Sequence, residues 1–293
     1  MDVSVSLMKQ DILVGGMALL EGVMMKSDER IGIAVRDPDG KIVTKQERFV
    51  SRTRNRILGL PFIRGIVNMA EMLYLGMKSL NYSADIALEE EEGSSNVWLM
   101  ALSLIVGIGL AVVLFKFLPF GGAWLAGNLV DLSGPAFYIL EGLIKIGLFI
   151  GYLYLISLLP DIKRVFQYHG AEHKTVACHE QKKGLTAKNV AGCSRFHPRC
   201  GTSFVVFVIL LSIVVYAFIP AELSFWVRFG LRILLLPVLA SVSYEILRFS
   251  AKRPDSVLFR IISAPGLWTQ RITTGEPDKG QIQVAIKALR TAS

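Results

Sequence analysis

The sequence predicts a membrane protein of the all-α class with a small β element, built as a bundle of four transmembrane helices. Its composition is too apolar for an ordinary soluble domain, with 52% hydrophobic residues and a mean hydropathy of +0.48. The apolar residues also gather in runs close to the roughly 20 residues that an α-helix needs to cross a bilayer. The four predicted spans cover about residues 97–118, 136–160, 203–219 and 223–247.

Positive charge is distributed unevenly between these spans, and its distribution predicts their orientation. No Lys or Arg lies in residues 119–135, whereas residues 161–202 contain eight against three acids, and residues 248–293 also contain eight against three. By the positive-inside rule, both termini and the loop between the second and third spans are expected in the cytoplasm. The net charge of +8 then follows from facing an anionic lipid surface, and nucleic acid is not expected as a partner.

The regions outside the spans are expected to contain regular structure of their own. Two alternating strands around an Asp-Pro-Asp-Gly turn predict a β-hairpin over about residues 31–48. Helical apolar spacing predicts an amphipathic helix over about residues 61–88. The chain then divides into a cytoplasmic N-terminal region over 1–96, the bundle over 97–247 with its cytoplasmic loop over 161–202, and a cytoplasmic tail over 248–293.

All four histidines and all three cysteines of the 293-residue chain fall within the predicted central loop. His169, Glu172 and His173 stand at i, i+3 and i+4, so a helix would place the three side chains on one face. Two imidazoles at this spacing can bind one metal ion from a single helix. The string is also the inverted zincin pattern H-x-x-E-H, in which the glutamate acts as general base. Gly170 within the string disfavours a regular helix.

A second half-site follows directly before the third predicted span. His197 and Cys200 lie three residues apart on a turn that contains Pro198. Together with His169 and His173 they would complete a tetrahedral zinc site of the closed, structural kind. If only three of the four bind the ion, one position stays open for water, which is the catalytic arrangement. A hydrogen-bonded polar cluster without metal is the alternative interpretation.

Other polar residues near this cluster have weaker assignments. Cys178 is either an additional ligand or a buried small side chain. His179 and Cys193 are interpreted as incidental. Lys174 and Arg199 could hold an anionic group, although a charge that faces lipid headgroups is the simpler interpretation for each.

Two pairs of ionisable residues lie well inside the predicted spans, where burial of charge is costly. Glu141 and Lys145 stand at i and i+4 in the second span, and Arg228 and Arg232 do the same in the fourth. Because the two pairs lie at similar depths, we expect Glu141 to pair with Arg228 or Arg232 between the helices. Such a pair would either lock the bundle together or line a polar pocket or anion pathway.

Four segments of the chain resemble, in the same order, the YqhQ-like bacterial membrane proteins: "GGMALLEGVMM", "YHGAEHKTV", "HPRCGTSF" and "SAPGLWTQRITT". This is a family of unknown function, some of whose members are labelled predicted metal-dependent enzymes. The resemblance implies a protein of the bacterial inner membrane. The family pattern often has a cysteine at Cys178 and usually has a glutamine where this chain has Met17. It matches this chain at Glu21, Gly22, His169, Gly170, Glu172, His173, Lys174, His197, Pro198, Arg199, Cys200 and Gly201.

Two main classes of function are open at this point, and a transporter is a third option for which four spans without a broken helix would form a poor pathway. The first is a divalent-metal-dependent enzyme, with hydrolysis as the simplest chemistry, acting at the cytoplasmic face on a lipid, a peptide or a membrane-bound precursor. Glu172 would activate water and Arg199 would stabilise negative charge. The second is a non-enzymatic scaffold or assembly factor that binds a partner protein, its metal or polar cluster only stapling the loop. In the enzyme, zinc would be bound by His169, His173 and His197, with Cys200 as a fourth ligand or nearby.

Overall fold

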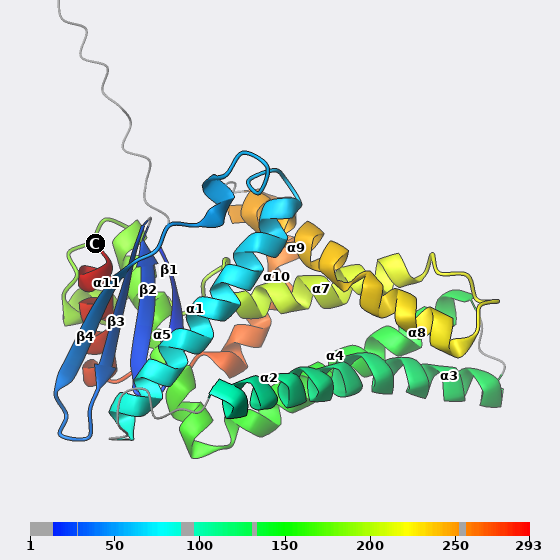
Figure 1. Cartoon of the computed structure of the whole chain (residues 1–293), viewed down its shortest axis with the longest axis horizontal. Helices are drawn as coiled ribbons and strands as arrows, with labels where there is room; N and C mark the ends of the chain where they lie inside the picture. The colour runs from blue at the N-terminus through cyan, green and yellow to red at the C-terminus, as the bar shows by residue number, and fades with distance from the viewer. Residues whose placement is uncertain (1–13, 28, 89–96, 131–133, 252–255) are drawn as a thin grey trace, which may run out of the picture.

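The computed structural model describes residues 14–27, 29–88, 97–130, 134–251 and 256–293. Within these ranges the chain is mostly helical, with one antiparallel sheet of four strands. Figure 1 shows the sheet at one end of the molecule, with long helices that extend away from it. A mostly helical fold with a small β element is therefore confirmed.

The sheet is a meander whose strands follow the order β1-β2-β3-β4. β3 (Arg30–Arg36) and β4 (Ile42–Arg48) form the predicted hairpin. Gly40 in its turn has a φ of +83°, a conformation that glycine adopts without strain. A second hairpin, β1 (Gly15–Leu19) and β2 (Gly22–Ser27), precedes it and was not predicted. β2 is buried on both faces of the sheet, so its sequence lacks the alternation that reveals a half-exposed strand.

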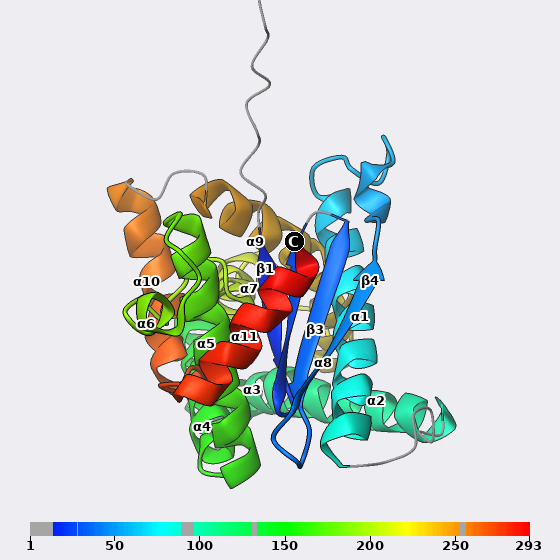
Figure 2. The same cartoon turned by 90° about the vertical axis from the view of Figure 1, so that its left-hand side faces the viewer.

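Helices cover both faces of this sheet (Figure 2). α11 (Lys279–Ala292) and α5 (Pro160–Glu180) pack on one face, and α1 (Ile63–Ala87) packs on the other. Met25 of β2 shares a buried cluster with α5 and α11, while the neighbouring Met24 shares one with α1. The last helix of the chain therefore completes the core of the N-terminal sheet.

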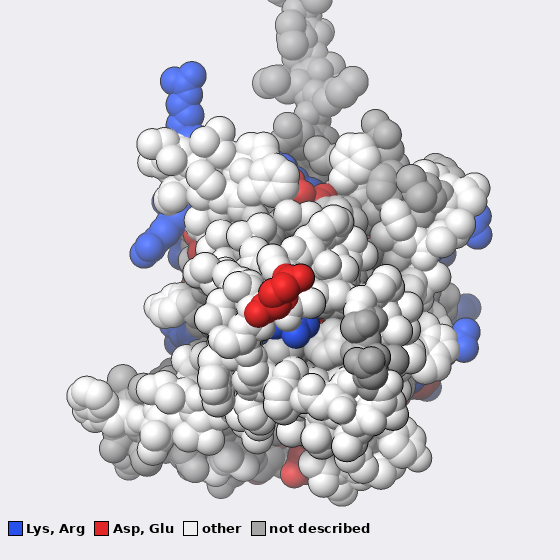
Figure 3. Space-filling view, turned by 90° about the vertical axis from the view of Figure 1, so that its right-hand side faces the viewer, with Lys and Arg blue, Asp and Glu red and all other residues white. Residues whose placement is uncertain are grey.

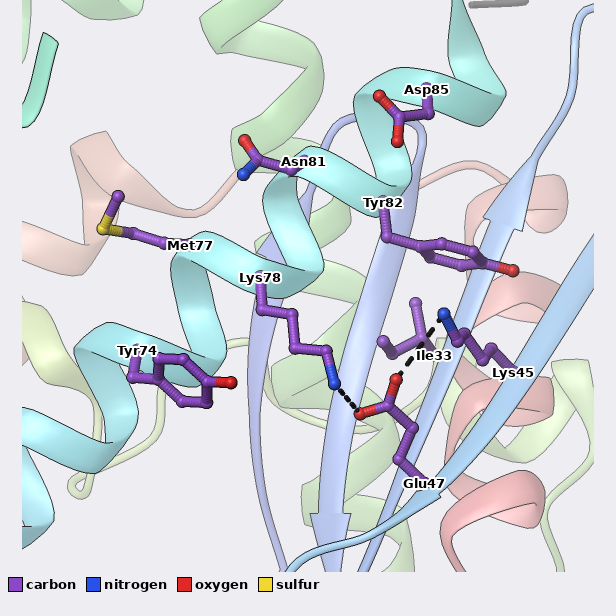
Figure 4. Close-up of a pocket in the computed structure, with 9 residues that line it drawn as sticks. All are labelled: Ile33, Lys45, Glu47, Tyr74, Met77, Lys78, Asn81, Tyr82 and Asp85. Atoms are coloured by element: carbon purple, nitrogen blue, oxygen red, sulfur yellow. Dashed lines mark hydrogen bonds and ion pairs between the residues drawn. The ribbon is translucent and has the colours of Figure 1, made fainter. Parts of the chain in front are cut away.

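A cleft of about 380 Å³ with both apolar and charged lining residues lies between α1 and the sheet, near β4. Figure 4 shows Lys78 and Lys45 directed at the carboxylate of Glu47, with Tyr74 and Tyr82 also lining the cleft. These ion pairs are partly exposed, so they contribute little to stability. The cleft is separate from the histidine and cysteine cluster.

The first long helix does not end where the sequence predicts. α2 (Val97–Val112), the π-helical turn η2 (Val113–Phe117) and α3 (Leu118–Val130) follow one another without a break. The expected end of the span at residue 118 is therefore wrong, and most of the uncharged stretch beyond it is helix rather than loop. The π-helical turn ends two residues before Pro119, whose missing N–H would otherwise interrupt the α-helical hydrogen bonds.

Two helices in the described part of the chain are long and apolar enough to cross a membrane, Leu102–Val130 and α4 (Gly134–Ser157). A third candidate is the pair α8 (Phe225–Leu234) and α9 (Leu236–Ala251), which meet at a bend of 40°. α7 (Gly201–Tyr216) is also apolar, but its 16 residues make it shorter than a usual span. Two or three candidate spans are thus present where four are predicted.

The segment predicted as a cytoplasmic loop contains α5 and the short α6 (Ala187–Ala191). Beyond it, α10 (Val257–Thr273) lies against α7. The two helices are so close that a Cβ on Gly266 would lie 2.6 Å from the Ser203 side chain. This contact brings the C-terminal region beside the turn before α7.

A short 3-10 turn, η1 (Arg52–Arg54), lies between β4 and α1.

Candidate metal centre

The two candidate histidine ligands lie on α5, which is a regular helix in spite of its central glycine. Pro160 opens the helix at its first position, where a missing N–H costs nothing. Gly170 is required for close packing, because a Cβ there would lie 2.0 Å from the carbonyl oxygen of Gly275. The Gly275 N–H in turn donates to the Phe166 carbonyl at 2.7 Å. The glycine that disfavoured a helix in the sequence therefore docks α5 against the segment after α10.

Backbone carbonyls orient both imidazole rings. Nδ1 of His169 lies 2.8 Å from the Thr273 carbonyl oxygen, and Nδ1 of His173 lies 2.6 Å from the Arg195 carbonyl oxygen. Since a carbonyl only accepts, each Nδ1 donates, and each Nε2 keeps its lone pair. A hydrogen bond from the second ring nitrogen to a carbonyl is the usual support of a metal-binding histidine.

Cys200 supplies the third donor atom. Its Sγ lies 3.3 Å from Nε2 of His169, and the donor atoms of His169, His173 and Cys200 all lie within 4.8 Å of one another. Cys200 is the N-cap of α7, so the start of this helix fixes the position of its side chain. Zinc bonds of about 2.0 Å to nitrogen and 2.3 Å to sulfur place tetrahedral ligands roughly 3.3–3.8 Å apart. The distance between Cys200 and His169 matches this spacing, and the 4.8 Å limit places His173 close enough to complete the set with a small shift.

His197, the other predicted ligand, lies beside this trio without joining it. Its ring centroid is 5.8 Å from that of His173. Its Nε2 lies 3.1 Å from a carboxylate oxygen of Glu180, and its Nδ1 accepts from the Arg199 N–H at 3.4 Å. Burial lowers the pKa of His197, and the charge of Glu172 opposes this shift. Both ring nitrogens of His197 are therefore engaged within the protein.

Glu172, the predicted general base, is buried between the trio and strand β1. Its Oε2 lies 3.4 Å from Nε2 of His173. A Cβ on Gly16 of β1 would come within 2.7 Å of the Glu172 side chain, so this strand position leaves room only for glycine. Burial raises the pKa of Glu172, whereas His169, His197 and Arg199 favour its charged form. Burial also lowers the pKa of the neighbouring His173.

The basic residues near the trio are paired within the protein. Arg199 forms an ion pair with Glu180, and burial lowers the pKa of its guanidinium. Lys174 is buried, donates to the Ala191 carbonyl at 2.9 Å and pairs with Glu276. The interpretation of Lys174 as a charge facing lipid headgroups is therefore wrong.

The remaining residues of the predicted cluster lie elsewhere. Cys178 and Cys193 are buried together against Ile282 and Ile286 of α11, where they act as small apolar side chains. His179 is likewise absent from the group of donor atoms.

Sequence reasoning missed the contribution of α10. The Gln270 side chain accepts the His197 N–H at 2.8 Å and donates to the His197 carbonyl at 2.7 Å and to Ser203 Oγ at 3.0 Å. Thr273, one turn further on, provides the carbonyl that orients His169. The polar positions of "SAPGLWTQRITT" at spacing i, i+3 were the available signal for this buried face.

These features define a mostly helical protein with a small sheet, apolar helices long enough to cross a membrane, and a candidate centre of two histidines and one cysteine. The chain belongs to the family described as "Protein of unknown function (DUF1385)", whose sequence profile matches residues 60–293. It is 38% identical over 290 residues to "Uncharacterized protein YqhQ" of Bacillus subtilis (strain 168), over 94% of this chain and 90% of that protein. No solved structure matches the chain. The predicted family membership is thereby confirmed.

Proposed function

We propose that the chain is a divalent-metal-dependent enzyme, a hydrolase that acts at the cytoplasmic face of the bacterial plasma membrane. The observation that supports this most is the trio of donor atoms, in which carbonyl bonds at Nδ1 leave both Nε2 atoms directed into the group. Three protein ligands leave one tetrahedral position open, which distinguishes catalytic from structural zinc sites. The expected His197 ligand is not needed for this arrangement.

Each residue has a distinct role in this proposal. His169, His173 and Cys200 hold zinc, which when bound supplies Lewis acidity and lowers the pKa of water. Glu172 accepts a proton from water, since its carboxylate lies against His173 and is shielded by β1. Arg199, which is held by its ion pair with Glu180, stabilises the negative charge that develops during the reaction.

The packing of the sheet supports four membrane crossings. β1 to β4, α5 and α11 form one folded unit, so they lie on the same side of a membrane. Between these elements the chain runs out along α2 and α3 and returns along α4, then runs out along α7 and returns along α8 and α9 (Figure 1). Each excursion therefore contains an even number of crossings. We assign two to each and place the sheet in the cytoplasm, following the charge distribution.

The test compares full-length wild type with Glu172→Gln, both purified with zinc. Each is incubated with a lipid extract and with a membrane-peptide fraction of a bacterial host, and products are identified by mass spectrometry. We expect a product from the wild type that falls by at least about 100-fold in Glu172→Gln, the usual scale for loss of a general base. Equal zinc in both proteins with no product from either would contradict the proposal.

A second candidate function, a scaffold with a structural centre, is favoured by the burial of the site. His173, Cys200 and Glu172 are nearly inaccessible, and the cluster ties α5, the turn before α7 and α10 together. A scaffold should tolerate Glu172→Gln in cells and lose its fold on His169→Ala or Cys200→Ser. An enzyme should lose function on Glu172→Gln and keep both fold and metal.

A further inference from the structure

A buried polar cluster lies in the part of the bundle remote from the sheet, well away from the metal centre. Arg232 of α8 binds both oxygens of Glu141 of α4, at 2.9 and 3.3 Å. Lys145 lies 3.5 Å from the same carboxylate and donates to Ser212 Oγ at 3.0 Å. The predicted pairing of Glu141 is thus confirmed, with Arg232 as the partner rather than Arg228.

The cluster contains more positive than negative charge. Glu141 is its one acid among the described residues, against Lys145, Arg228, Arg232 and Lys116, which donates to the Tyr216 hydroxyl at 3.3 Å. Lys145 and Arg232 are 1% and 0% exposed, so water does not compensate them. Uncompensated cations in such surroundings are costly, and arginine does not relieve the cost by losing its proton.

Arg228 is the residue whose charge is left without a counter-ion. It is 7% exposed, its Nε is buried without a hydrogen-bond partner, and its guanidinium forms no ion pair within the described residues. The guanidinium lies 4.8 Å from the Phe137 ring centroid and 5.4 Å from that of Phe120. Arg232 lies 4.0 Å from the same Phe120 ring, so both guanidinium groups pack against one aromatic side chain.

The depth of the cluster indicates what can reach it. Trp226 and Phe218 are 70% and 83% exposed at the same end of the bundle, and exposed aromatic residues of this kind mark the headgroup level of a membrane. Figure 3 shows this end of the molecule as a largely uncharged face with an acidic and a basic group next to each other near its middle. A phosphate at headgroup depth therefore lies within reach of a forked guanidinium, which binds phosphate through two hydrogen bonds.

We propose that Arg228, supported by Arg232 and the two lysines, forms an anion site that binds a phosphate group, either that of an anionic lipid headgroup or free phosphate. The phosphate is the missing counter-ion of the cluster. Glu141 is already shared by Arg232 and Lys145, so it does not fill this role. The site is independent of the metal centre.

The test measures the thermal unfolding midpoint of the full-length protein in detergent. Short-chain phosphatidylglycerol, short-chain phosphatidylcholine or inorganic phosphate is added to wild type, Arg228→Gln and the exposed-surface control Arg56→Gln. We expect an anionic ligand to raise Tm by several degrees in wild type and in Arg56→Gln, and by less than about one degree in Arg228→Gln. Phosphatidylglycerol acting alone identifies a lipid headgroup, and an equal shift with inorganic phosphate identifies the free ion.

Two further variants distinguish loss of the anion site from a general loss of stability. Arg232→Gln removes the partner of Glu141, so it should lower Tm before any ligand is added, whereas Arg228→Gln breaks no ion pair within the described residues and loses only contacts with aromatic rings. Glu222→Gln removes the exposed acid between α7 and α8 and should keep the ligand response. The proposal is overturned if neither anion shifts the wild type, or if Arg228→Gln responds as the wild type does.

Discussion

At the residue scale, the candidate centre depends on a few close contacts that set where each side chain points. The two carbonyls at Nδ1 of His169 and His173 determine which nitrogen faces Cys200. Glycines allow the approach of the surrounding backbone, at Gly170 against Gly275 and at Gly16 against Glu172. Backbone carbonyls and glycines, which take no part in the proposed chemistry, therefore set the positions of the side chains that do.

Gly170→Ala tests this dependence. The added Cβ would meet a backbone oxygen at 2.0 Å, so α5 must move away from the segment after α10. We expect a loss of about 1–3 kcal/mol in the free energy of unfolding, measured by denaturant titration in detergent, together with weaker zinc retention. Gly192→Ala is the matched control, because its Cβ would lie an ordinary 3.5 Å from the Asn189 carbonyl oxygen. Equal stability of the two variants would show that α5 does not dock as described.

The sequence predicted part of the site at this scale. The i, i+4 spacing identified His169 and His173, and proximity on the chain identified Cys200. It could not show that His197 lies beside the trio, because that position depends on Glu180 and on the Arg199 N–H, which are placed by folding. Nor could it show that Lys174 is bound to Glu276, more than 100 residues away, since no local pattern encodes such a contact.

At the element scale, α10 connects the turn before α7 to the site. Gln270 makes three hydrogen bonds, two to the His197 backbone and one to Ser203, and all of these groups are buried. Gln270→Ala would leave them without partners. We expect a loss of roughly 2–5 kcal/mol in the free energy of unfolding, because each unsatisfied buried polar group costs about 1–3 kcal/mol.

Gln283→Ala provides the comparison for this prediction. Gln283 is exposed on α11, where alanine is the better helix former, so the change should be within about 0.5 kcal/mol of neutral. If Gln270→Ala is as stable as Gln283→Ala, the hydrogen bonds of Gln270 do not hold α10 against the turn before α7, and this role of α10 is contradicted.

The elements differ in how well the sequence predicted them. The β3–β4 hairpin has one half-exposed strand and a turn signal, and it was predicted. β2 was missed because burial on both sides replaces alternation with a plain apolar run, and β1 was missed because it is a short edge strand of five residues that begins with two glycines. The junction of α2 and α3 was misplaced because Pro119 and two glycines indicate a loop, whereas the π-helical turn η2 lets the helix continue.

At the scale of the whole molecule, the two ends of the described chain meet on one sheet. Charge placement predicted that they lie on one side of the membrane, but it gave no reason for them to touch. The contact of α11 with β2 and β3 supplies that reason, and together with the contact of α5 with β1 it requires an even number of crossings on each excursion of the proposed topology. This parity is the basis for the proposed four spans, in which the short α7 crosses.

Cysteine labelling in intact cells tests that topology. All three native cysteines are buried, so Glu222→Cys in the exposed connection between α7 and α8 would introduce a reactive thiol. We expect a membrane-impermeant maleimide to label Glu222→Cys in intact cells. Lys287→Cys, on the exposed face of α11, should be labelled only after permeabilisation. Protection of Glu222→Cys in intact cells, with labelling after permeabilisation, would show that α7 does not cross.

The central claim is that His169, His173 and Cys200 bind one metal ion beside a glutamate that is not a ligand. The most direct measurement is the metal content of the full-length protein purified in detergent without chelator, by elemental mass spectrometry, for wild type, His173→Ala and Glu172→Gln. The account predicts about one zinc per chain in wild type and Glu172→Gln, and none in His173→Ala. Absence of stoichiometric metal from all three proteins would contradict the account and leave a hydrogen-bonded polar cluster in its place.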